Sequence, residues 1–353
     1  MNDLATLARR IADLGGRDIA EVRLLRLPAH VPPWTDTGLV LAEGESVTWI
    51  ACGRIVMAEA LDLWGGPRFH LWARQGGRLF NGTRDTFTFR AERAGALELA
   101  VYSGEWKSPA GDLATPREAY AGLTGGLEAL LLRWRGDPRQ GLAGLEAGLG
   151  PGTPLGAERA RLESPVLPPR GWRYLWTLGE SEIFSAARED GSPAIRIDAA
   201  SDVGILLRDV EFPLADDTRL RWRWRVDELP SGRAEDGLPT HDYVSLALAF
   251  ENGRDLTWYW SAALPREHGY ACPLPGWNAR ETHVVVRSGG EGLGAWQREE
   301  RAVRADYERT VGPPPSTITG AWLIAVSLFQ HGRARAVFSD VVLEGAGRRL
   351  RVL

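Results

Sequence analysis

Residues 219–226 alternate strictly between arginine and large apolar side chains, and this pattern constrains the fold more than any other. Successive side chains of a β-strand point to opposite faces of its sheet, so alternation is typical of a strand with one buried face. One face carries Leu220, Trp222, Trp224 and Val226, and the other carries Arg219, Arg221, Arg223 and Arg225. The segment therefore predicts a half-buried strand in a layered β-structure.

The C-terminal half contains further segments with the length and composition of strands. They occupy residues 244–250, 256–261, 282–287, 322–329 and 335–342. Few helical patterns interrupt them, so we expect an antiparallel β-sandwich or jelly roll of two sheets over residues 171–353.

The N-terminal half shows a second series of short strands, punctuated by glycine pairs. Alternating segments lie at residues 45–51, 86–89 and 97–102, and they predict a β-sandwich over residues 22–113. A helix is expected before it, within residues 1–21, because apolar side chains recur at helical spacing from Met1 to Gly15. These side chains are Leu4, Leu7, Ile11 and Leu14.

Residues 114–170 change period and predict a helical connector followed by a linker. Thr115-Pro116-Arg117-Glu118 forms a capping box with proline at the first helical position. The helix it begins would reach about Arg135 and bury Leu123, Leu127, Leu130 and Leu131. A second, shorter helix would begin at Asp137-Pro138, and the Pro- and Gly-rich residues 148–170 would be the linker. The predicted fold is mainly β, with two antiparallel β-sandwich or jelly-roll domains joined by this segment.

Composition excludes several classes of partner and site. A net charge of -4 does not provide the basic field of a general nucleic-acid binder. No apolar run is long enough for a membrane span, and Arg9, Arg10 and Asp13 break any signal-peptide core, so we expect a cytoplasmic protein. The two cysteines, Cys52 and Cys272, favour no disulfide and cannot form a four-thiolate zinc site.

Tryptophan is the one strong anomaly in composition, with 15 residues. Tryptophan fills cores, and it is also a preferred platform for sugar rings. The chain has no phosphate-binding loop, no dinucleotide-binding glycine motif, no zinc-protease motif and no nucleophile elbow. A binding function is therefore favoured over these enzyme classes.

A β-hairpin over residues 240–261 is the main candidate for a site, because it combines aromatic, acidic and histidine side chains. If Asn252-Gly253 forms a two-residue turn, Ala247 faces Trp258 and Ser245 faces Trp260. A bulge in the turn would shift this register by one residue and exchange the faces of one strand. Small residues opposite tryptophan leave room either for core side chains or for a ligand.

The candidate catalytic residues are His241, Asp242, Tyr243, Glu281, His283 and Glu299. Glu281 and His283 lie two apart on one predicted strand, so they share a face. Together with His241 they are able to form a metal site or a general acid and base pair. Neither spacing is diagnostic, and we expect no metal and no cofactor. The acids Glu235 and Asp236 lie in a predicted loop and are expected to be solvated.

The candidate ligand-binding residues combine aromatic rings with polar groups, which suits a sugar or a similar polyhydroxylated ligand. They are Trp222, Trp224, Asp255, Trp258, Tyr259, Trp296, Arg301 and Asp306. A salt-bridged turn that holds the last strands is the structural alternative for the group around Glu299, Arg301 and Asp306.

Several N-terminal motifs resemble the PA-I-like galactose-binding lectin family over roughly residues 30–113. They are Trp34-Thr35-Asp36-Thr37-Gly38, residues 43–53 and residues 95–102. The resemblance implies a small jelly-roll sandwich that binds calcium and sugar through a loop after Tyr102. That loop here reads Ser103-Gly104-Glu105-Trp106-Lys107 and lacks the family's Asn-Asp pair. Because calcium needs several oxygen ligands, we expect the fold without the calcium site.

The C-terminal half resembles a bacterial family catalogued as domain of unknown function 3047, over about residues 171–345. The motifs that carry the resemblance are Gly171-Trp172-Arg173, residues 221–224, Glu235-Asp236, His241-Asp242-Tyr243, residues 255–261, residues 281–283, residues 296–299, Arg301 and Asp306-Tyr307. The resemblance implies a domain boundary but no reaction, substrate or catalytic residue.

Two functions remain open from the sequence. The first is a protein that binds a glycan or another small polyhydroxylated molecule through its C-terminal sandwich, with no nucleic acid and no membrane as partner. The second is a hydrolase or lyase that acts on a saccharide with the histidines and carboxylates above. Their convergence in one open cleft would favour the enzyme. The sequence does not indicate an oligomeric state.

Overall fold

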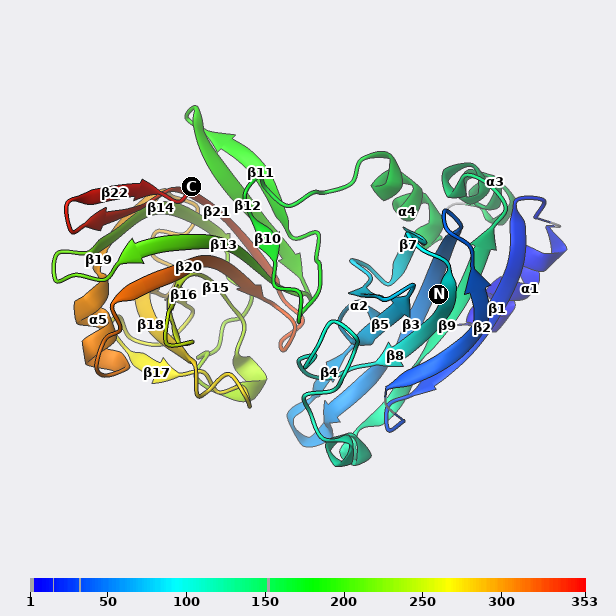
Figure 1. The fold of residues 1–353 in the computed structure, drawn as a ribbon, viewed down its shortest axis with the longest axis horizontal. Helices are drawn as coiled ribbons and strands as arrows, with labels where there is room; N and C mark the ends of the chain where they lie inside the picture. Colours follow the sequence, from blue (N-terminus) through cyan, green and yellow to red (C-terminus); the bar gives the residue numbers. More distant parts are fainter. Residues whose placement is uncertain (1–2, 15, 32, 151–152) are drawn as a thin grey trace. The chain divides into compact units, whose positions relative to one another are not determined.

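A computed structural model describes residues 3–14, 16–31, 33–150 and 153–353 (Figure 1). The chain divides into two compact units, Met1–Val166 and Leu167–Leu353, which we describe separately as the N-terminal and C-terminal units. Both are built mainly from antiparallel strands, as the sequence predicts. None of the described helices has the length and apolar character needed to cross a membrane.

Two antiparallel sheets form the N-terminal unit. The larger contains β1 (Ile19–Pro28), β9 (Thr124–Trp134), β3 (Ser46–Ala58), β4 (Leu63–Gly65) and β7 (Thr86–Arg90). The smaller contains β2 (Trp34–Leu41), β8 (Gly95–Val101), β5 (Leu71–Gln75) and β6 (Arg78–Asn81). Short helical turns η1 (Glu59–Leu61), α2 (Pro67–His70) and η2 (Arg117–Gly122) join some of these strands. One core of buried side chains, including Val47, Trp49 and Leu99, draws on both sheets.

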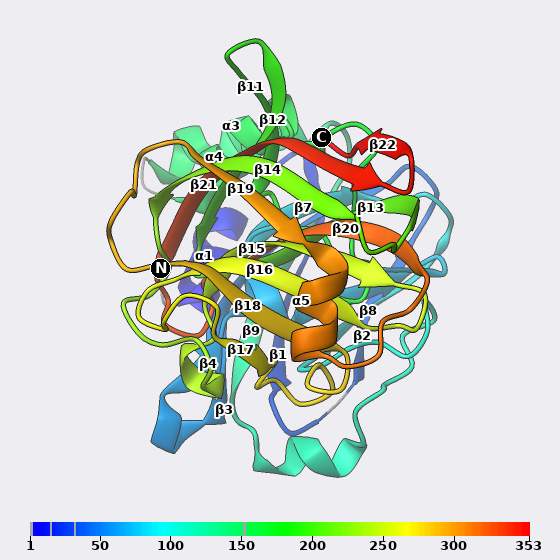
Figure 2. The same ribbon diagram turned by 90° about the vertical axis from the view of Figure 1, so that its left-hand side faces the viewer.

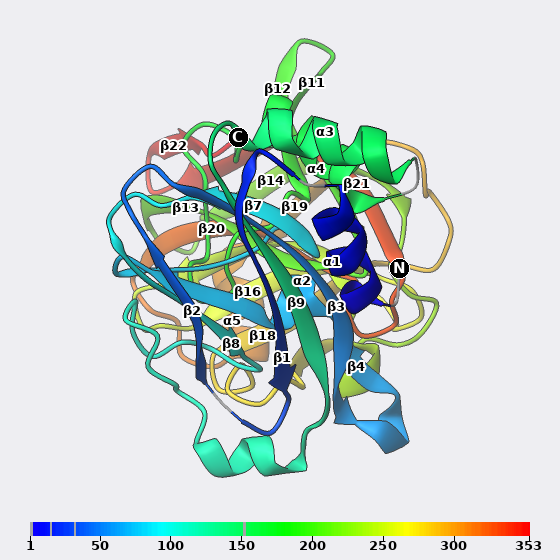
Figure 3. The ribbon, with the colours of Figure 1, turned by 90° about the vertical axis from the view of Figure 1, so that its right-hand side faces the viewer.

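Three helices pack on the outer face of the larger sheet, as Figure 3 shows for α1 and α3. They are α1 (Leu4–Asp13), α3 (Pro138–Leu149) and α4 (Pro154–Glu163). The predicted N-terminal helix is confirmed over Leu4–Asp13, and Leu4, Leu7 and Ile11 are buried. Leu14 is 44% exposed and does not join this face. Met1, Asn2 and Gly15 of that prediction lie outside the described residues.

The helix predicted from Thr115 to Arg135 is wrong, because most of this segment is strand β9. Leu127 and Leu131 point into the sandwich, whereas Leu130 and Leu132 point outward beneath the three helices. A strand buried on both faces loses its polar alternation, and its short apolar run then looks like a buried helix. Only η2 precedes it as a helical turn.

The predicted second helix is confirmed as α3, with Asp137 accepting a hydrogen bond from the Arg139 backbone N–H at its N-terminus. The predicted linker, in contrast, contains α4. Its Glu158 is buried, accepts a hydrogen bond from the Thr88 backbone N–H (2.6 Å) and pairs with Arg161 at 2.8 Å. The boundary between the two units falls within the predicted linker, after Val166, but α4 was missed because Pro and Gly at the ends of a short helix resemble loop composition.

The C-terminal unit is a second sandwich (Figure 2). Its seven-stranded sheet has the order β10 (Arg173–Tyr174), β13 (Val203–Pro213), β20 (Thr317–Val326), β15 (Tyr243–Phe250), β16 (Asp255–Ser261), β18 (Glu281–Ser288) and β17 (Gly269–Ala271). Its six-stranded sheet contains β11 (Phe184–Glu189), β12 (Ser192–Ala200), β21 (Arg333–Gly345), β14 (Arg219–Glu228), β19 (Gln297–Ala302) and β22 (Arg348–Arg351). Among the described pairs of strands only β16 and β18 run parallel. The turn η3 (Leu238–Thr240) precedes β15, and α5 (Val303–Thr310) follows β19.

The alternation in β14 is confirmed by its surroundings. Trp222 and Trp224 lie in the core between the two sheets and are 2% and 0% exposed. On the opposite face Arg221 pairs with Glu300 and Glu344. The arginines of this strand therefore form a surface ladder of ion pairs, a contribution that is small for each pair.

A second buried layer covers the outer face of the seven-stranded sheet. Segments 229–242 and 262–280 lie over strands β15, β16 and β18 and contribute Leu264, Cys272 and Trp277 to this layer. Polar side chains on the outer face of these strands are thus buried although they do not belong to the sandwich core.

His70 gives the N-terminal unit a defined pH dependence. Its side chain is 0% exposed, its Nδ1 lies 2.8 Å from the Tyr102 carbonyl oxygen, and burial lowers its pKa to about 4. Because the pKa in the folded state lies below the unfolded value, this contribution to stability is complete above about pH 6.5. It is lost as the pH falls towards 4, by about 3 kcal/mol in total.

We therefore expect His70→Gln to flatten the dependence of the unfolding free energy on pH between 7 and 4.5. Urea unfolding at a series of pH values measures this slope. The matched control is His30→Gln, because His30 is exposed and its replacement should keep the wild-type slope. Equal slopes for wild type and His70→Gln would contradict the assignment.

Candidate functional site

The hairpin of β15 and β16 exists, in the register shifted by one residue. Ala249 pairs with Asp255, and Ser245 pairs with Tyr259. The Phe250 backbone N–H donates to the Arg254 carbonyl, so the turn is wider than a two-residue one. Trp258 consequently enters the sandwich core. The polar side chains on the opposite face of β16 are Asp255, Thr257, Tyr259 and Ser261.

Pairing between neighbouring strands brings distant polar residues into two rows on this outer face. In the parallel pair, Asp255 lies beside Glu281 and Thr257 lies beside His283. The edge strand β17 adds Tyr270 beside His283. Cys272, just after β17, donates its backbone N–H to the Glu281 carbonyl oxygen. The sheet thereby assembles residues from three sequence segments at one place.

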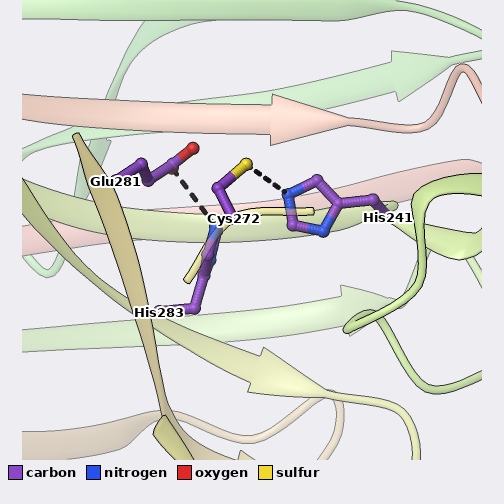
Figure 4. A group of neighbouring side chains, drawn as sticks. All are labelled: His241, Cys272, Glu281 and His283. Atoms are coloured by element: carbon purple, nitrogen blue, oxygen red, sulfur yellow. Dashed lines mark hydrogen bonds and ion pairs between the residues drawn. The ribbon is translucent and has the colours of Figure 1, made fainter. Parts of the chain in front are cut away.

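Four side chains converge here, and we call them the His–Cys–Glu–His cluster: His241, Cys272, Glu281 and His283 (Figure 4). Each offers one ligand atom, and these atoms all lie within 4.8 Å of one another. The residues are 0%, 1%, 2% and 0% exposed. His241 comes from the segment before β15, while Glu281 and His283 share one face of β18, as predicted from their spacing.

His241 has one ring nitrogen fixed by the backbone and the other directed into the cluster. Its Nδ1 lies 2.6 Å from the Glu235 carbonyl oxygen, an acceptor that requires Nδ1 to carry the proton. Its Nε2 is then an acceptor and lies 3.4 Å from the Cys272 Sγ. This arrangement leaves a nitrogen lone pair facing the cluster, which is the tautomer that a metal-binding histidine requires.

Glu281 is oriented by two hydroxyl groups. Tyr243 and Thr257 donate hydrogen bonds to its Oε1 at 3.1 and 3.2 Å. His283 Nε2 lies 3.5 Å from the same oxygen, and neither ring nitrogen of His283 has a hydrogen-bond partner among the described residues. A buried imidazole whose two ring nitrogens both lack a hydrogen bond is uncommon, because each unpaired polar atom costs about 1–3 kcal/mol.

Burial dominates the protonation states. It lowers the pKa of His241 to about 3, helped by His283, so this imidazole is neutral. It also raises the pKa of the Cys272 thiol, and Glu281 adds to that shift. Burial and the charge of Glu281 raise the pKa of Asp255 well above its usual range. Burial alone would raise the pKa of Glu281 as well, but the neighbouring His283 lowers it. Glu281 is therefore the charged member of this carboxyl pair.

Glu235 is buried, which corrects the expectation that it is a solvated loop acid. It is 2% exposed, and its carboxylate accepts hydrogen bonds from the Ser261 hydroxyl (2.5 Å) and the Ala262 backbone N–H (2.6 Å). Its neighbour Asp236 is exposed, as expected. Glu235 thus ties segment 229–242 to the end of β16, and its carbonyl oxygen orients His241.

The predicted catalytic set is split by the structure. His241, Tyr243, Glu281 and His283 meet in or beside the cluster, but Asp242 and Glu299 do not. Asp242 accepts hydrogen bonds from the backbone N–H groups of Phe329 (3.0 Å) and Gln330 (2.6 Å) and holds a loop. Burial raises its pKa to about 6. Glu299 accepts a hydrogen bond from Trp224 Nε1 at 3.0 Å and pairs with Arg287.

The predicted ligand-binding set is largely buried, and this is a correction. Most of its rings and one carboxylate are at most 2% exposed, namely Trp222, Trp224, Trp258, Tyr259 and Asp255. Arg301 and Asp306 form a cluster of ion pairs with Glu267, the structural alternative expected for that turn. Trp296 remains partly exposed, beneath Arg223 at 4.6 Å and Arg225 at 5.6 Å. The alternation of β14 had indicated that Trp222 and Trp224 share one buried face.

Sequence reasoning missed Cys272, Thr257, Tyr270 and the role of Glu235. Cys272 follows a three-residue edge strand and has no local motif. Only the pairing of β17 with β18 brings it to Glu281, and that pairing has no signal in a single sequence. Thr257 and Tyr259 share a strand face with Asp255, so alternation from Asp255 was the one available indication.

Comparison with protein families gives one match. Residues 170–342 match a family described as a protein of unknown function, DUF3047, which confirms the resemblance drawn from the C-terminal motifs. A comparison with curated proteins found no match.

Comparison with solved structures gives distant β-rich proteins. The N-terminal domain of EclA, described as a PllA-like lectin, is 18% identical and has a TM-score of 0.26. The match covers 31% of this chain and 95% of the lectin domain. The xyloglucanase domain of NopAA from Sinorhizobium fredii, in complex with cellobiose, is 9% identical and has a TM-score of 0.30. The match covers 50% of this chain and 94% of that domain. A family 30 carbohydrate-binding module of a Clostridium thermocellum cellulase is 12% identical and has a TM-score of 0.27. The match covers 48% of this chain and 86% of that module. Similarity this low says nothing about the ligand of this chain.

Trp258 tests the corrected placement of the aromatic residues. We expect Trp258→Ala to lower the unfolding free energy of the C-terminal unit by about 3–5 kcal/mol, the usual range for removing a fully buried ring. It also removes the 2.9 Å hydrogen bond from Trp258 Nε1 to Asp306. Calorimetric unfolding measures the effect. Trp296→Ala is the matched control and should change stability by less than about 1 kcal/mol, because this ring is partly exposed. A small effect for Trp258→Ala would show that the ring is not in the core.

Proposed function

We propose that the protein binds a carbohydrate or a similar polyhydroxylated ligand, and that the C-terminal unit carries the site. The observation that supports this proposal is the position of Trp322 on the outer face of the seven-stranded sheet. Trp322 pairs with Leu207 on one side and Ala247 on the other. It remains partly exposed, so one part of its ring is open to a ligand.

Small residues beside Trp322 let its indole lie along the sheet. A Cβ added to Gly320 would be 3.2 Å from Trp322 Nε1 and 3.5 Å from the Ala249 Cβ, so this neighbourhood is close-packed around the ring edge. Ala249 itself is partly exposed. A flat, partly exposed indole is the surface on which the C–H face of a sugar ring stacks.

Asp255 lies on the same face but is 1% exposed, so it is not itself within reach of a sugar hydroxyl. Gly320, Ala249 and Asp255 are partners in one cross-strand row, so Asp255 is about 10 Å from Gly320 at the usual strand spacing. Asp255 Oδ1 has no hydrogen-bond partner among the described residues. The backbone N–H of Asp255 donates a hydrogen bond to the Arg280 carbonyl oxygen. The guanidinium of Arg280 stacks on the Trp277 ring at 3.8 Å.

The N-terminal unit offers a less suitable surface. Trp106, in the loop that corresponds to the sugar-binding loop of the lectin-like resemblance, stacks on Tyr102 at 3.9 Å and on Trp34 at 5.3 Å. Trp72 and Trp106 are 3% and 2% exposed. The chain's own rings therefore occupy the region where a ligand would stack, which favours the C-terminal unit as the site.

Burial also argues against the alternative of a hydrolase or lyase that uses the predicted histidines and carboxylates. His241, Glu281 and His283 are at most 2% exposed, and a saccharide cannot touch them in this conformation. A general acid or base must come within hydrogen-bonding reach of the substrate. Their convergence has a different consequence, developed below.

Binding to an array of glycans tests the proposal. We expect the wild-type chain to retain at least one glycan and Trp322→Ala to weaken that binding by about tenfold or more, the loss of about 1.4 kcal/mol of stacking. Trp296→Ala is the matched control, because this partly exposed ring lies on the other sheet beneath two arginines. Binding to no glycan, or equal losses for the two variants, would contradict the proposal.

A further inference from the structure

The His–Cys–Glu–His cluster combines the ligand types that a zinc-class ion prefers. Thiolate sulfur, imidazole nitrogen and carboxylate oxygen all bind Zn²⁺, most often four at a time in a tetrahedron. Ca²⁺ and Mg²⁺ take oxygen ligands instead, and this cluster offers a sulfur and two nitrogens. The donor set therefore selects a borderline or soft transition metal.

The spacing of the donors fits that geometry. Bonds of about 2.0–2.3 Å in a tetrahedron place neighbouring donors about 3.3–3.8 Å apart. The Cys272 Sγ to His241 Nε2 distance is 3.4 Å, and the His283 Nε2 to Glu281 Oε1 distance is 3.5 Å. Both of these pairs have the separation expected when an ion lies between them, and all four donors remain within 4.8 Å.

One side chain of the cluster lacks the hydrogen bonds that a buried polar group needs. His283 is fully buried, and both of its ring nitrogens are without a hydrogen bond among the described residues. His241 presents an unprotonated nitrogen to the same point, since its Nδ1 is held by the Glu235 carbonyl oxygen. A bound cation would coordinate the free ring nitrogen of His241 and the Nε2 of His283, while the Glu235 carbonyl oxygen continues to orient the His241 ring.

We propose that His241, Cys272, Glu281 and His283 bind one zinc-class divalent metal ion in the interior of the C-terminal unit. The two neutral imidazoles, one thiolate and one carboxylate balance the charge of +2, so the buried site is neutral overall. Binding releases the Cys272 thiol proton to solvent and involves no change in oxidation state. The site goes beyond the carbohydrate-binding proposal and does not depend on it.

The expectation of no metal was drawn from the sequence without Cys272 among the candidates. Without it, the two histidines and Glu281 equally suited acid and base chemistry. The thiol raises the number of protein ligands to four, which is the closed coordination of a structural ion; a catalytic zinc usually keeps one position for water.

The ion would fasten the layer that covers the sheet. His241 ends segment 229–242, Cys272 lies in segment 262–280, and Glu281 and His283 belong to β18. The covering segments are also attached by strand β17, by the hydrogen bonds of Glu235 and Asp242, and by the ion pair of Glu267 with Arg301. Tyr243 and Thr257 hold Glu281 by hydrogen bonds and act as positioning residues.

Metal content of the full-length, untagged chain tests the site. We expect about one zinc-class ion per chain by elemental mass spectrometry, and Co²⁺ added to the metal-free protein should give the charge-transfer absorption of a cobalt–thiolate bond. Cys272→Ser should abolish this absorption and His283→Ala should lower the metal content. The matched controls, Cys52→Ser and His30→Ala, replace a partly buried cysteine and an exposed histidine of the N-terminal unit and should leave both readouts unchanged.

Wild-type protein that binds no ion and gives no cobalt–thiolate absorption overturns the proposal. Absorption that persists in Cys272→Ser, or disappears in Cys52→Ser, also overturns it, because the ion is then elsewhere. The test holds even if the variants at the cluster do not fold, because the wild-type titration and the two control variants decide whether the chain binds an ion.

Hydrogen exchange of the wild-type chain tests the structural role. We expect removal of the ion with a chelator to increase exchange at least tenfold in segments 229–242 and 262–280. The N-terminal unit is the internal control and should keep its exchange rates. Loss of the ion without faster exchange in these two segments would overturn the fastening role while leaving the metal site itself in place.

Discussion

Strand β16 carries the constraint on which the C-terminal unit depends, because it is buried on both faces. Trp258 and Trp260 fill the sandwich core on one side. On the other, Asp255, Thr257 and Tyr259 are at most 1% exposed beneath segments 229–242 and 262–280. Burying polar groups is unfavourable unless each finds a partner, so the covering segments must supply these partners. Glu235 does so for Tyr259 and Ser261.

The same requirement explains why the His–Cys–Glu–His cluster differs from the rest of the interior. Glu235 and Asp242 are fully engaged by backbone and hydroxyl donors. His283 makes no hydrogen bond through either ring nitrogen, and its Nε2 lies 3.5 Å from Glu281 Oε1. A cation bound at the cluster would coordinate the Cys272 sulfur, the Glu281 carboxylate and both imidazoles. Stability of the layer and occupancy of the cluster are thereby linked.

Local sequence patterns predicted much of the fold. The errors in strand β9 and in the candidate ligand-binding residues have the same cause. Alternation in β14 correctly separated its inward tryptophans from its outward arginines. It failed for β9, where Leu130 and Leu132 face helices instead of water. It also placed Trp222 and Trp224 on the buried face of a half-buried strand, yet their chemical type made them candidate ligand contacts. Burial, which depends on what covers a strand, decided against them.

The sequence by itself determined the strand character of both units, the shared face of Glu281 and His283, and the β-hairpin whose turn lies just before Asp255. These are consequences of a two-residue period that each strand carries alone. Only the tertiary structure decided that β18 lies parallel to β16 and that Cys272 and His241 reach the same point. Strand order and the path of covering segments arise from packing between distant parts of the chain, and no local pattern encodes them.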